Sequence, residues 1–200
     1  MARRALVLAL LVGASAAAEP FHVDLRARVG ALAGADQLGS SPYSGDYEAE
    51  NSLTWGPEMV FRQGWGAGLG YAVSLAFFAS DQRGSREGVD VTYASAGVEL
   101  GVGLTWRFGR YWHLEPMVDA SLGRGRTIIE PDGVPEIEGD SNDLRGVGAR
   151  LGLFWTHPQG LQIGLRGGWS SFKGHSTITG DQVEVSGAGP NAVFLLGYSL

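Results

Sequence analysis

Residues 21–31 read FHVDLRARVGA, and every odd position in this stretch carries an apolar side chain. The even positions between them are His22, Asp24, Arg26, Arg28 and Gly30. A hydrophobic period of two residues predicts a β-strand, because successive side chains of a strand point to opposite faces of its sheet. One face of this strand is therefore suited to hydrocarbon and the other to polar surroundings.

The same alternation recurs along the rest of the chain. Residues 161–169, for example, place Leu161, Ile163 and Leu165 on one face and Gln162 and Arg166 on the other. The alternating segments are residues 21–31, 53–62, 65–77, 97–107, 114–123, 146–155, 161–169 and 191–200. A chain built from these eight segments is expected to be all-β.

Connections between the segments alternate in length. Short turns are expected at residues 63–64, 108–112 and 157–160, and long polar loops at residues 33–52, 79–90, 123–143 and 171–182. This arrangement is typical of outer-membrane barrels with both termini on the periplasmic side. We therefore predict an eight-stranded antiparallel transmembrane β-barrel with up-and-down topology.

The aromatic residues distinguish this barrel from a soluble, lipocalin-like barrel, whose apolar face would point inward. All six tryptophans fall at strand ends or in a turn. Amphipathic rings favour the two interfaces of a bilayer, so they predict two girdles. The periplasmic girdle is expected to contain Phe61, Trp65, Trp106, Phe108, Tyr111, Trp112, Trp155 and Tyr198, and the outer girdle Trp55, Phe77 and Trp169.

The first 18 residues have the pattern of an export signal. Arg3 and Arg4 precede an apolar run over residues 5–12, and Ala16-Ala17-Ala18 provides a small-residue cleavage site. The apolar run is too short to span a bilayer. We expect a signal peptide over residues 1–18 and a barrel domain over residues 19–200.

From Phe21 to Leu200 this architecture resembles the small eight-stranded outer-membrane barrels of the outer-membrane protein A/X and opacity types. The resemblance rests on strand pattern and loop lengths, and on a C-terminus, Tyr198-Ser199-Leu200, that keeps the alternation. It implies a location in the outer membrane of a Gram-negative-type bacterium. It also implies assembly by the barrel assembly machinery, contact with outer-membrane lipid and lipopolysaccharide, and a monomeric state.

Composition excludes several other classes of protein. The chain contains no cysteine, which excludes disulfide frameworks and thiol chemistry. A net charge of −6 argues against nucleic-acid binding, which requires a clustered basic surface. Neither a cofactor nor a metal site is expected, because the four histidines are scattered along the chain.

Charged residues recur on the polar face of the predicted strands. An eight-stranded barrel is just wide enough for side chains to fill it, so these residues are expected to form a paired charge lattice that blocks the lumen. Arg150 and Arg166 are expected to pair with carboxylates such as Glu99 or Asp119. The predicted members are Asp24, Arg26, Arg28, Glu58, Arg62, Glu99, Arg107, Glu115, Asp119, Arg150 and Arg166. The alternative is a proton or ion pathway, or a narrow porin.

Four cations continue the outward face of three neighbouring strands beyond the apolar band: Arg124, Arg126, Arg145 and Lys173. They are predicted to bind lipopolysaccharide phosphates through charge-assisted hydrogen bonds. The alternative is that they pair with acidic residues of the third long loop. The loops carry the excess negative charge and could also contact a surface ligand.

Enzymatic activity receives little support from the sequence, so a non-enzymatic structural or surface-interaction role is expected and no catalytic residue is assigned. Some barrels of this size are lipid A deacylases that use His, Ser and an acidic residue near the outer rim. His175, Ser176 and Glu184 resemble such a set. Lipid A esterase activity is therefore kept as an alternative.

Overall fold

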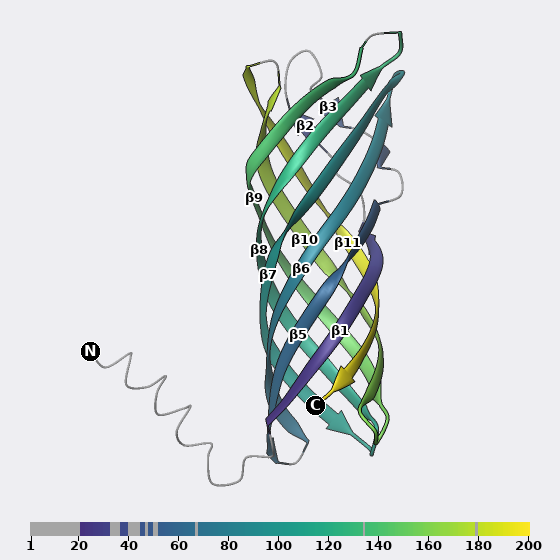
Figure 1. Cartoon of the computed structure of the whole chain (residues 1–200), viewed down its shortest axis with the longest axis vertical. Helices are drawn as coiled ribbons and strands as arrows, with labels where there is room; N and C mark the ends of the chain where they lie inside the picture. The colour runs from purple at the N-terminus through teal and green to yellow at the C-terminus, as the bar shows by residue number, and fades with distance from the viewer. Residues whose placement is uncertain are drawn as a thin grey trace, which may run out of the picture.

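The computed structural model describes residues 21–32, 37–39, 45–46, 48–49, 52–66, 68–133, 135–178 and 180–200. Eight long antiparallel strands form a closed ring, as predicted (Figure 1). In ring order they are β1 (Phe21–Leu32), β5 (Ser52–Gly66), β6 (Leu69–Arg86), β7 (Val89–Phe108), β8 (Trp112–Pro131), β9 (Ile137–Thr156), β10 (Leu161–Ile178) and β11 (Asp181–Ser199). The expected signal peptide, residues 1–18, lies outside the described residues.

Three short strands lie in the segment that was expected to be the first long loop. β2 (Gln37–Gly39) pairs with β11 and with β3 (Gly45–Asp46), and β4 (Glu48–Ala49) pairs with β6. β2 thus pairs with β11 beyond the end of β1, and β4 pairs with β6 beyond the end of β5. None of the described residues forms a helix long and apolar enough to cross a membrane.

Pairing of β1 with β11 closes the barrel. If the register is followed once around the ring from His22, it returns to β1 at Leu32, ten residues further along. The intervening partners are Arg62, Ala72, Gly103, Met117, Arg150, Gly168 and Asn191. Such a stagger tilts the strands by roughly 35–45° from the barrel axis, and side chains fill the narrow interior.

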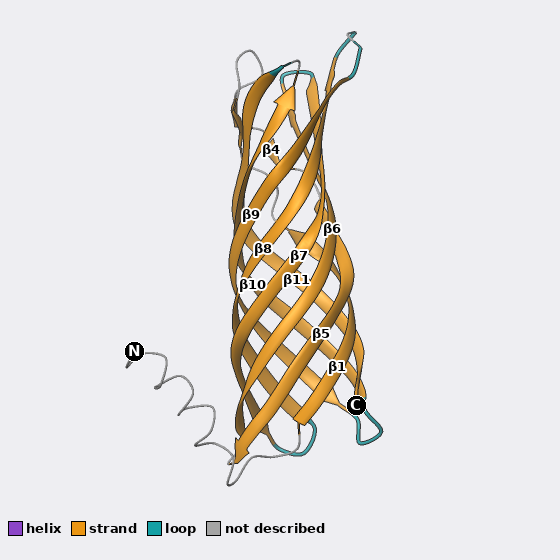
Figure 2. Ribbon diagram, turned by 60° about the vertical axis from the view of Figure 1, so that its left-hand side comes forward, coloured by secondary structure: helices purple, strands orange, loops and turns teal. Residues whose placement is uncertain are grey.

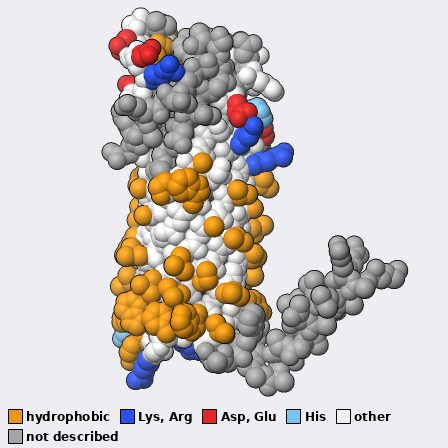
Figure 3. All heavy atoms as spheres, turned by 180° about the vertical axis from the view of Figure 1, so that it is seen from behind, with side chains coloured by type: hydrophobic (Ala, Val, Ile, Leu, Met, Phe, Trp, Pro, Cys, Tyr) orange, Lys and Arg blue, Asp and Glu red, His pale blue; other side chains and the backbone are white. Residues whose placement is uncertain are grey.

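Alternating side chains face opposite environments over the lower part of the barrel. On β10, the side chain of Leu165 is 65% exposed on the outside, whereas neighbouring Arg166 is only 3% exposed inside. An apolar exterior around a charged interior is stable only if hydrocarbon surrounds the barrel. Apolar side chains cover the lower and middle wall, and charged groups gather toward the two ends (Figure 3).

Aromatic residues lie near both edges of this apolar wall. Trp106 and Trp112 are exposed near the turn that joins β7 to β8, and Trp55, Phe77 and Trp169 are exposed nearer the opposite edge of the apolar wall. Trp106 contacts Phe108, with ring centroids 5.9 Å apart. The side chain of Trp65 lies outside the described part of the chain.

Strands extend much further than the sequence pattern predicted. Three of the four expected long loops consist mostly of strand, so that prediction of long loops was wrong. The connections that remain are short: they join Arg86 to Val89, Pro131 to Ile137 and Ile178 to Asp181. β6 to β11 therefore continue well past the ends of β1 and β5 (Figure 2).

This extension reverses the polarity of the wall. On β7, an inward position near the middle of the strand carries Glu99, whereas the same face carries Val91 and Tyr93 near the start of the strand. The buried apolar cluster of the extension contains Val91, Tyr93, Ile129, Leu144, Ile178 and Val185. The extension thus has an apolar core and a polar exterior, like a water-soluble barrel, and the level of the reversal marks the outer edge of the apolar band.

Candidate functional site

Arg26 lies at the centre of the lower half of the interior. Its two Nη atoms donate to the two carboxylate oxygens of Glu115, each at 2.7 Å, and Nη2 also donates to Asp24 at 2.8 Å. Arg62 donates to both oxygens of Asp24, at 2.5 and 2.8 Å. Four charges from β1, β5 and β8 therefore form one network, and every side chain in it except that of Arg62 is fully buried.

Two residues that the sequence reasoning left out complete this layer. The His113 Nε2 atom lies 3.1 Å from Glu115, and the ring of Phe154 lies 4.0 Å from the guanidinium carbon of Arg26. Phe154 packs where Gly152 and Gly164 have no side chain, since a Cβ at either position would collide with its ring. Both residues occupy inward-facing positions in the alternation of their strands. This alternation is the sequence signal that could have found them.

A second layer lies further along the barrel axis. Arg166 donates to both oxygens of Glu58 at 3.0 Å, and Arg28 donates to Glu99 at 2.9 Å. Arg150 connects these pairs: its guanidinium contacts Glu58 at 3.5 Å and Asp119 at 3.3 Å, and it also donates to Glu99. One arginine on β9 therefore binds carboxylates from three other strands.

The interior contains five arginines and five carboxylates, which we call the charge lattice: Asp24, Arg26, Arg28, Glu58, Arg62, Glu99, Glu115, Asp119, Arg150 and Arg166. Arg107 was also predicted to belong to it; this residue is exposed at the end of β7, where it lines a cavity together with Arg62 and His113. The expected partner of Arg166 was wrong, since Glu58 takes that position. The register between distant strands places Glu58 there, and the sequence alone does not show that register.

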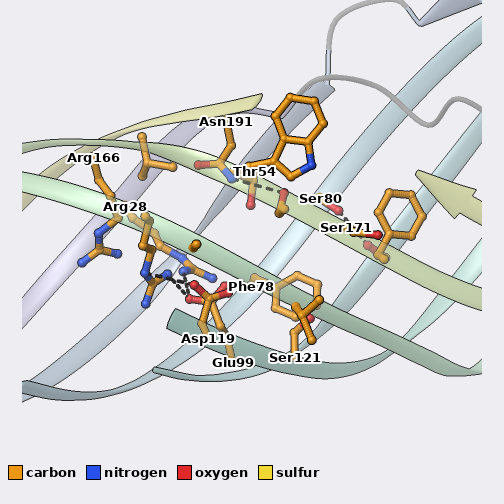
Figure 4. Close-up of a pocket in the computed structure, with 18 of the residues that line it drawn as sticks. Arg28, Thr54, Phe78, Ser80, Glu99, Asp119, Ser121, Arg166, Ser171 and Asn191 are labelled. Carbon is orange, nitrogen blue, oxygen red and sulfur yellow. Dashed lines mark hydrogen bonds and ion pairs between the residues drawn. The ribbon is translucent and has the colours of Figure 1, made fainter. Parts of the chain in front are cut away.

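Two cavities lie on either side of the central charges. The outer cavity, about 100 Å³, is lined by Arg28, Glu99, Asp119 and several hydroxyl groups (Figure 4). The second cavity, about 110 Å³, lies toward the turn between β7 and β8 and is lined by Arg62 and His113 among others. The central residues Arg26, Glu58 and Glu115 line neither cavity. Ion pairs and packed side chains thus fill the section between them.

The four rim cations face outward just above the apolar band, but they differ in their partners. Arg126 pairs with Glu138, and Lys173 pairs with Glu184 at 2.7 Å. Arg145 lies opposite Lys173 on β10 and opposite Leu122 on β8. Arg124 and Arg145 form no ion pair with any residue that the structure describes.

One polar contact next to the rim involves the bulge between β9 and β10. The backbone N–H of His175 donates to Asp143 at 2.8 Å, and the His175 Nδ1 atom lies 2.7 Å from the other carboxylate oxygen. These contacts hold the pKa of Asp143 below its usual value. The carboxylate therefore stays ionised well below neutral pH.

The strands form a closed ring with an apolar outer band, aromatic residues at both edges and a charged interior. The chain has the fold of a small outer-membrane β-barrel.

No family model matches the chain, and no curated protein matches it. Solved structures with a similar overall shape include Ail, the attachment invasion locus protein of Yersinia pestis, at 15% identity and TM-score 0.46, covering 91% of this chain and 99% of Ail. Neisserial surface protein A has 15% identity and TM-score 0.36, covering 92% and 97%. The translocator domain of the autotransporter NalP from Neisseria meningitidis has 11% identity and TM-score 0.45, covering 98% and 93%.

The barrel does not assemble the alternative deacylase-like set. Ser176 points into the extension, where it is fully buried and lies 3.1 Å from the Thr127 hydroxyl. His175 is exposed on the opposite face of β10, and Glu184 pairs with Lys173. The serine and the histidine are therefore separated by the barrel wall. Within the described ranges, no group of three or more His, Asp or Glu residues is placed to hold a metal ion.

Proposed function

We propose that this protein is a non-enzymatic, monomeric outer-membrane barrel with a closed lumen and a structural or surface-interaction role. It is exported by a signal peptide over residues 1–18 and assembled by the barrel assembly machinery. Its extension presents an acidic outer surface to the medium, where it can meet a surface ligand.

The observation that carries this proposal is the charge lattice. Five arginines and five carboxylates are matched inside a narrow barrel, and the central ones are buried without lining either cavity. Buried ions persist only when they are paired and hydrogen-bonded, which this arrangement provides. A pore would instead need charges that face a continuous aqueous path.

Cell fractionation and gel migration test the proposed location and class. The protein should separate with the outer membrane, and its mobility on a gel should change on boiling, as for a folded barrel. Lipid A extracted from cells that express it should keep the mass of lipid A from cells without it. A loss of one acyl chain would favour the esterase alternative.

We further propose that the rim cations anchor the barrel to lipopolysaccharide. Arg124 and Arg145 carry this role, because they lie just above the apolar band and the described residues offer them no carboxylate. Charge-assisted hydrogen bonds to phosphate are strong and suit the planar guanidinium group. Arg126 and Lys173 already pair with Glu138 and Glu184, so we expect them to contribute less.

Comparison of glutamine variants separates these two kinds of cation. The stability gained on adding lipopolysaccharide to a phosphatidylcholine bilayer should shrink in the Arg124→Gln/Arg145→Gln variant. It should change little in the Arg126→Gln variant. An unchanged gain in the double variant would contradict lipopolysaccharide anchoring.

A further inference from the structure

The outer wall carries an open apolar groove on the strands that bear the rim cations. The groove has a volume of about 570 Å³. Its lining includes Val102 on β7, Pro116 on β8, Ala149 and Leu151 on β9, and Gly167 on β10. All of these residues belong to the outward face within the apolar band. The groove therefore lies at membrane depth.

Outward-facing residues of β8, β9 and β10 connect the rim cations to this groove. Arg145 on β9 lies opposite Lys173 on β10. Every second residue from each of them toward the membrane also points outward. Three rows of cross-strand neighbours follow below this pair. The first row contains Ser171, Val147 and Ala120, the second Trp169, Ala149 and Val118, and the third Gly167, Leu151 and Pro116. Ala149 and Val118 of the second row line the groove. Ala149 follows Arg145 by four residues, which corresponds to about 13 Å along the strand.

We propose that the groove holds one acyl chain of a lipopolysaccharide molecule whose phosphate is bound by Arg124 and Arg145. This inference rests on the anchoring role proposed above. Charge complementarity selects the headgroup, because two arginines that have no ion-pair partner among the described residues lie over the apolar wall. An acyl chain runs from the headgroup to the bilayer midplane, about half of the ~30 Å hydrocarbon core, and so reaches from the rim into the groove.

The shape of the groove supplies the affinity for the chain. Lipid tails surround the whole barrel, so a chain gains nothing from hydrophobic transfer when it lies on the wall. It gains only where side chains fit closely around it. Small residues such as Ala149 and Gly167 provide that space, next to the large rings and branched chains of Trp169 and Leu151.

Gly167 offers a direct way to fill the groove. A Cβ atom at this position would meet only the carbonyl oxygen of Asn191, at 3.7 Å, so Gly167→Leu is compatible with the backbone. Ala149→Leu is a second filling variant on the neighbouring strand. The matched control is Ala27→Leu, which enlarges an exposed alanine on β1 that does not line the groove.

The experiment measures urea-unfolding midpoints in phosphatidylcholine bilayers with increasing mole fractions of lipopolysaccharide. The half-saturating mole fraction should rise roughly threefold in Gly167→Leu and in Ala149→Leu, because only van der Waals contacts are lost. Ala27→Leu should saturate like the wild type. Fully deacylated lipopolysaccharide, which keeps its phosphates, should affect the filling variants and the wild type equally.

Several results would overturn the inference. If both filling variants saturate like the wild type, no chain occupies the groove, and a loss seen only in Arg124→Gln/Arg145→Gln would leave the anchoring role intact. If that double variant also saturates like the wild type, both proposals fail. If Ala27→Leu weakens binding equally, the effect does not come from the groove. If phosphatidylglycerol saturates the barrel as readily as lipopolysaccharide, the occupant is a phospholipid and our assignment is wrong.

Discussion

Arg150 is the side chain on which the most interior carboxylates depend. It contacts Glu58, Glu99 and Asp119, and it donates to the Ser74 hydroxyl at 3.1 Å. Loss of one partner from a buried pair leaves an uncompensated charge, which is far more costly than loss of an exposed pair. The position of Arg150 thus makes it the most sensitive point of the charge lattice.

Substitution of Arg150 tests this dependence. Arg150→Met should lower the free energy of unfolding by about 3–5 kcal/mol, because buried carboxylates lose their partner. The control is Arg83→Met on the outer surface, where the exposed pair with Asp81 at 3.3 Å should contribute less than about 1 kcal/mol. Urea unfolding followed by tryptophan fluorescence measures both. Similar losses in the two variants would show that the interior pairs do not stabilise the barrel.

Asp143 provides a pH-dependent contribution outside the membrane. Its pKa is lowered in the folded state by the His175 backbone N–H and ring, so its stabilising effect is present above the unfolded pKa. That effect is lost as pH falls from about 4 through the lower folded pKa. Asp143→Asn should therefore lower stability near neutral pH by less than about 1 kcal/mol. The difference from wild type should vanish in strong acid, and a difference that persists there would exclude the ionised contact as its cause.

At the residue scale, parity along each strand predicted which charges face inward. It placed Arg26, Glu115 and Arg150 inside, where the structure has them. Parity did not predict partners, because Arg166 meets Glu58 through the register of strands that are far apart in sequence. Arg107 keeps this parity and lines a cavity, but it lies so close to the end of β7 that it stays exposed.

Strand ends were harder to predict than strand cores. Above the membrane, the inward positions of the same strands become apolar and the outward positions polar, as at Val91 and Asp90 on β7. Such segments are rich in acidic and small residues, and they look like loops when an apolar exterior is expected. The alternation continues in these segments, but its apolar residues point inward and its polar residues outward. This reversal is the signal that the sequence contained.

Epitope insertion tests the boundaries of these elements. An epitope inserted between Asp132 and Gly133, in the turn between β8 and β9, should be tolerated and labelled from outside intact cells. An insertion after Ser141 should disrupt the extension, because this residue pairs with both β8 and β10. An insertion at Gln159 in a periplasmic turn is the control and should not be labelled. Tolerance at Ser141 equal to that at Asp132 would show that the segment is a loop.

At the scale of the whole molecule, ring closure determines what the interior can do. Eight strands with a stagger of ten residues leave a narrow bore, and ten paired charges occupy it. Four of them, Asp24, Arg26, Glu58 and Glu115, line neither cavity. Equal numbers of arginines and carboxylates leave no excess charge of either sign to attract ions. Closure, charge balance and burial together support the proposal that the lumen is closed.

Current through a planar lipid bilayer tests this central claim most directly. Purified, refolded wild-type protein should insert without producing a steady conductance above that of the bare bilayer, because the charge lattice fills the bore. A refolded porin measured under the same conditions shows that insertion is detectable, and the gel shift on boiling shows that the added protein is folded. A reproducible, ohmic step for each inserted wild-type barrel would contradict the account and establish a pore.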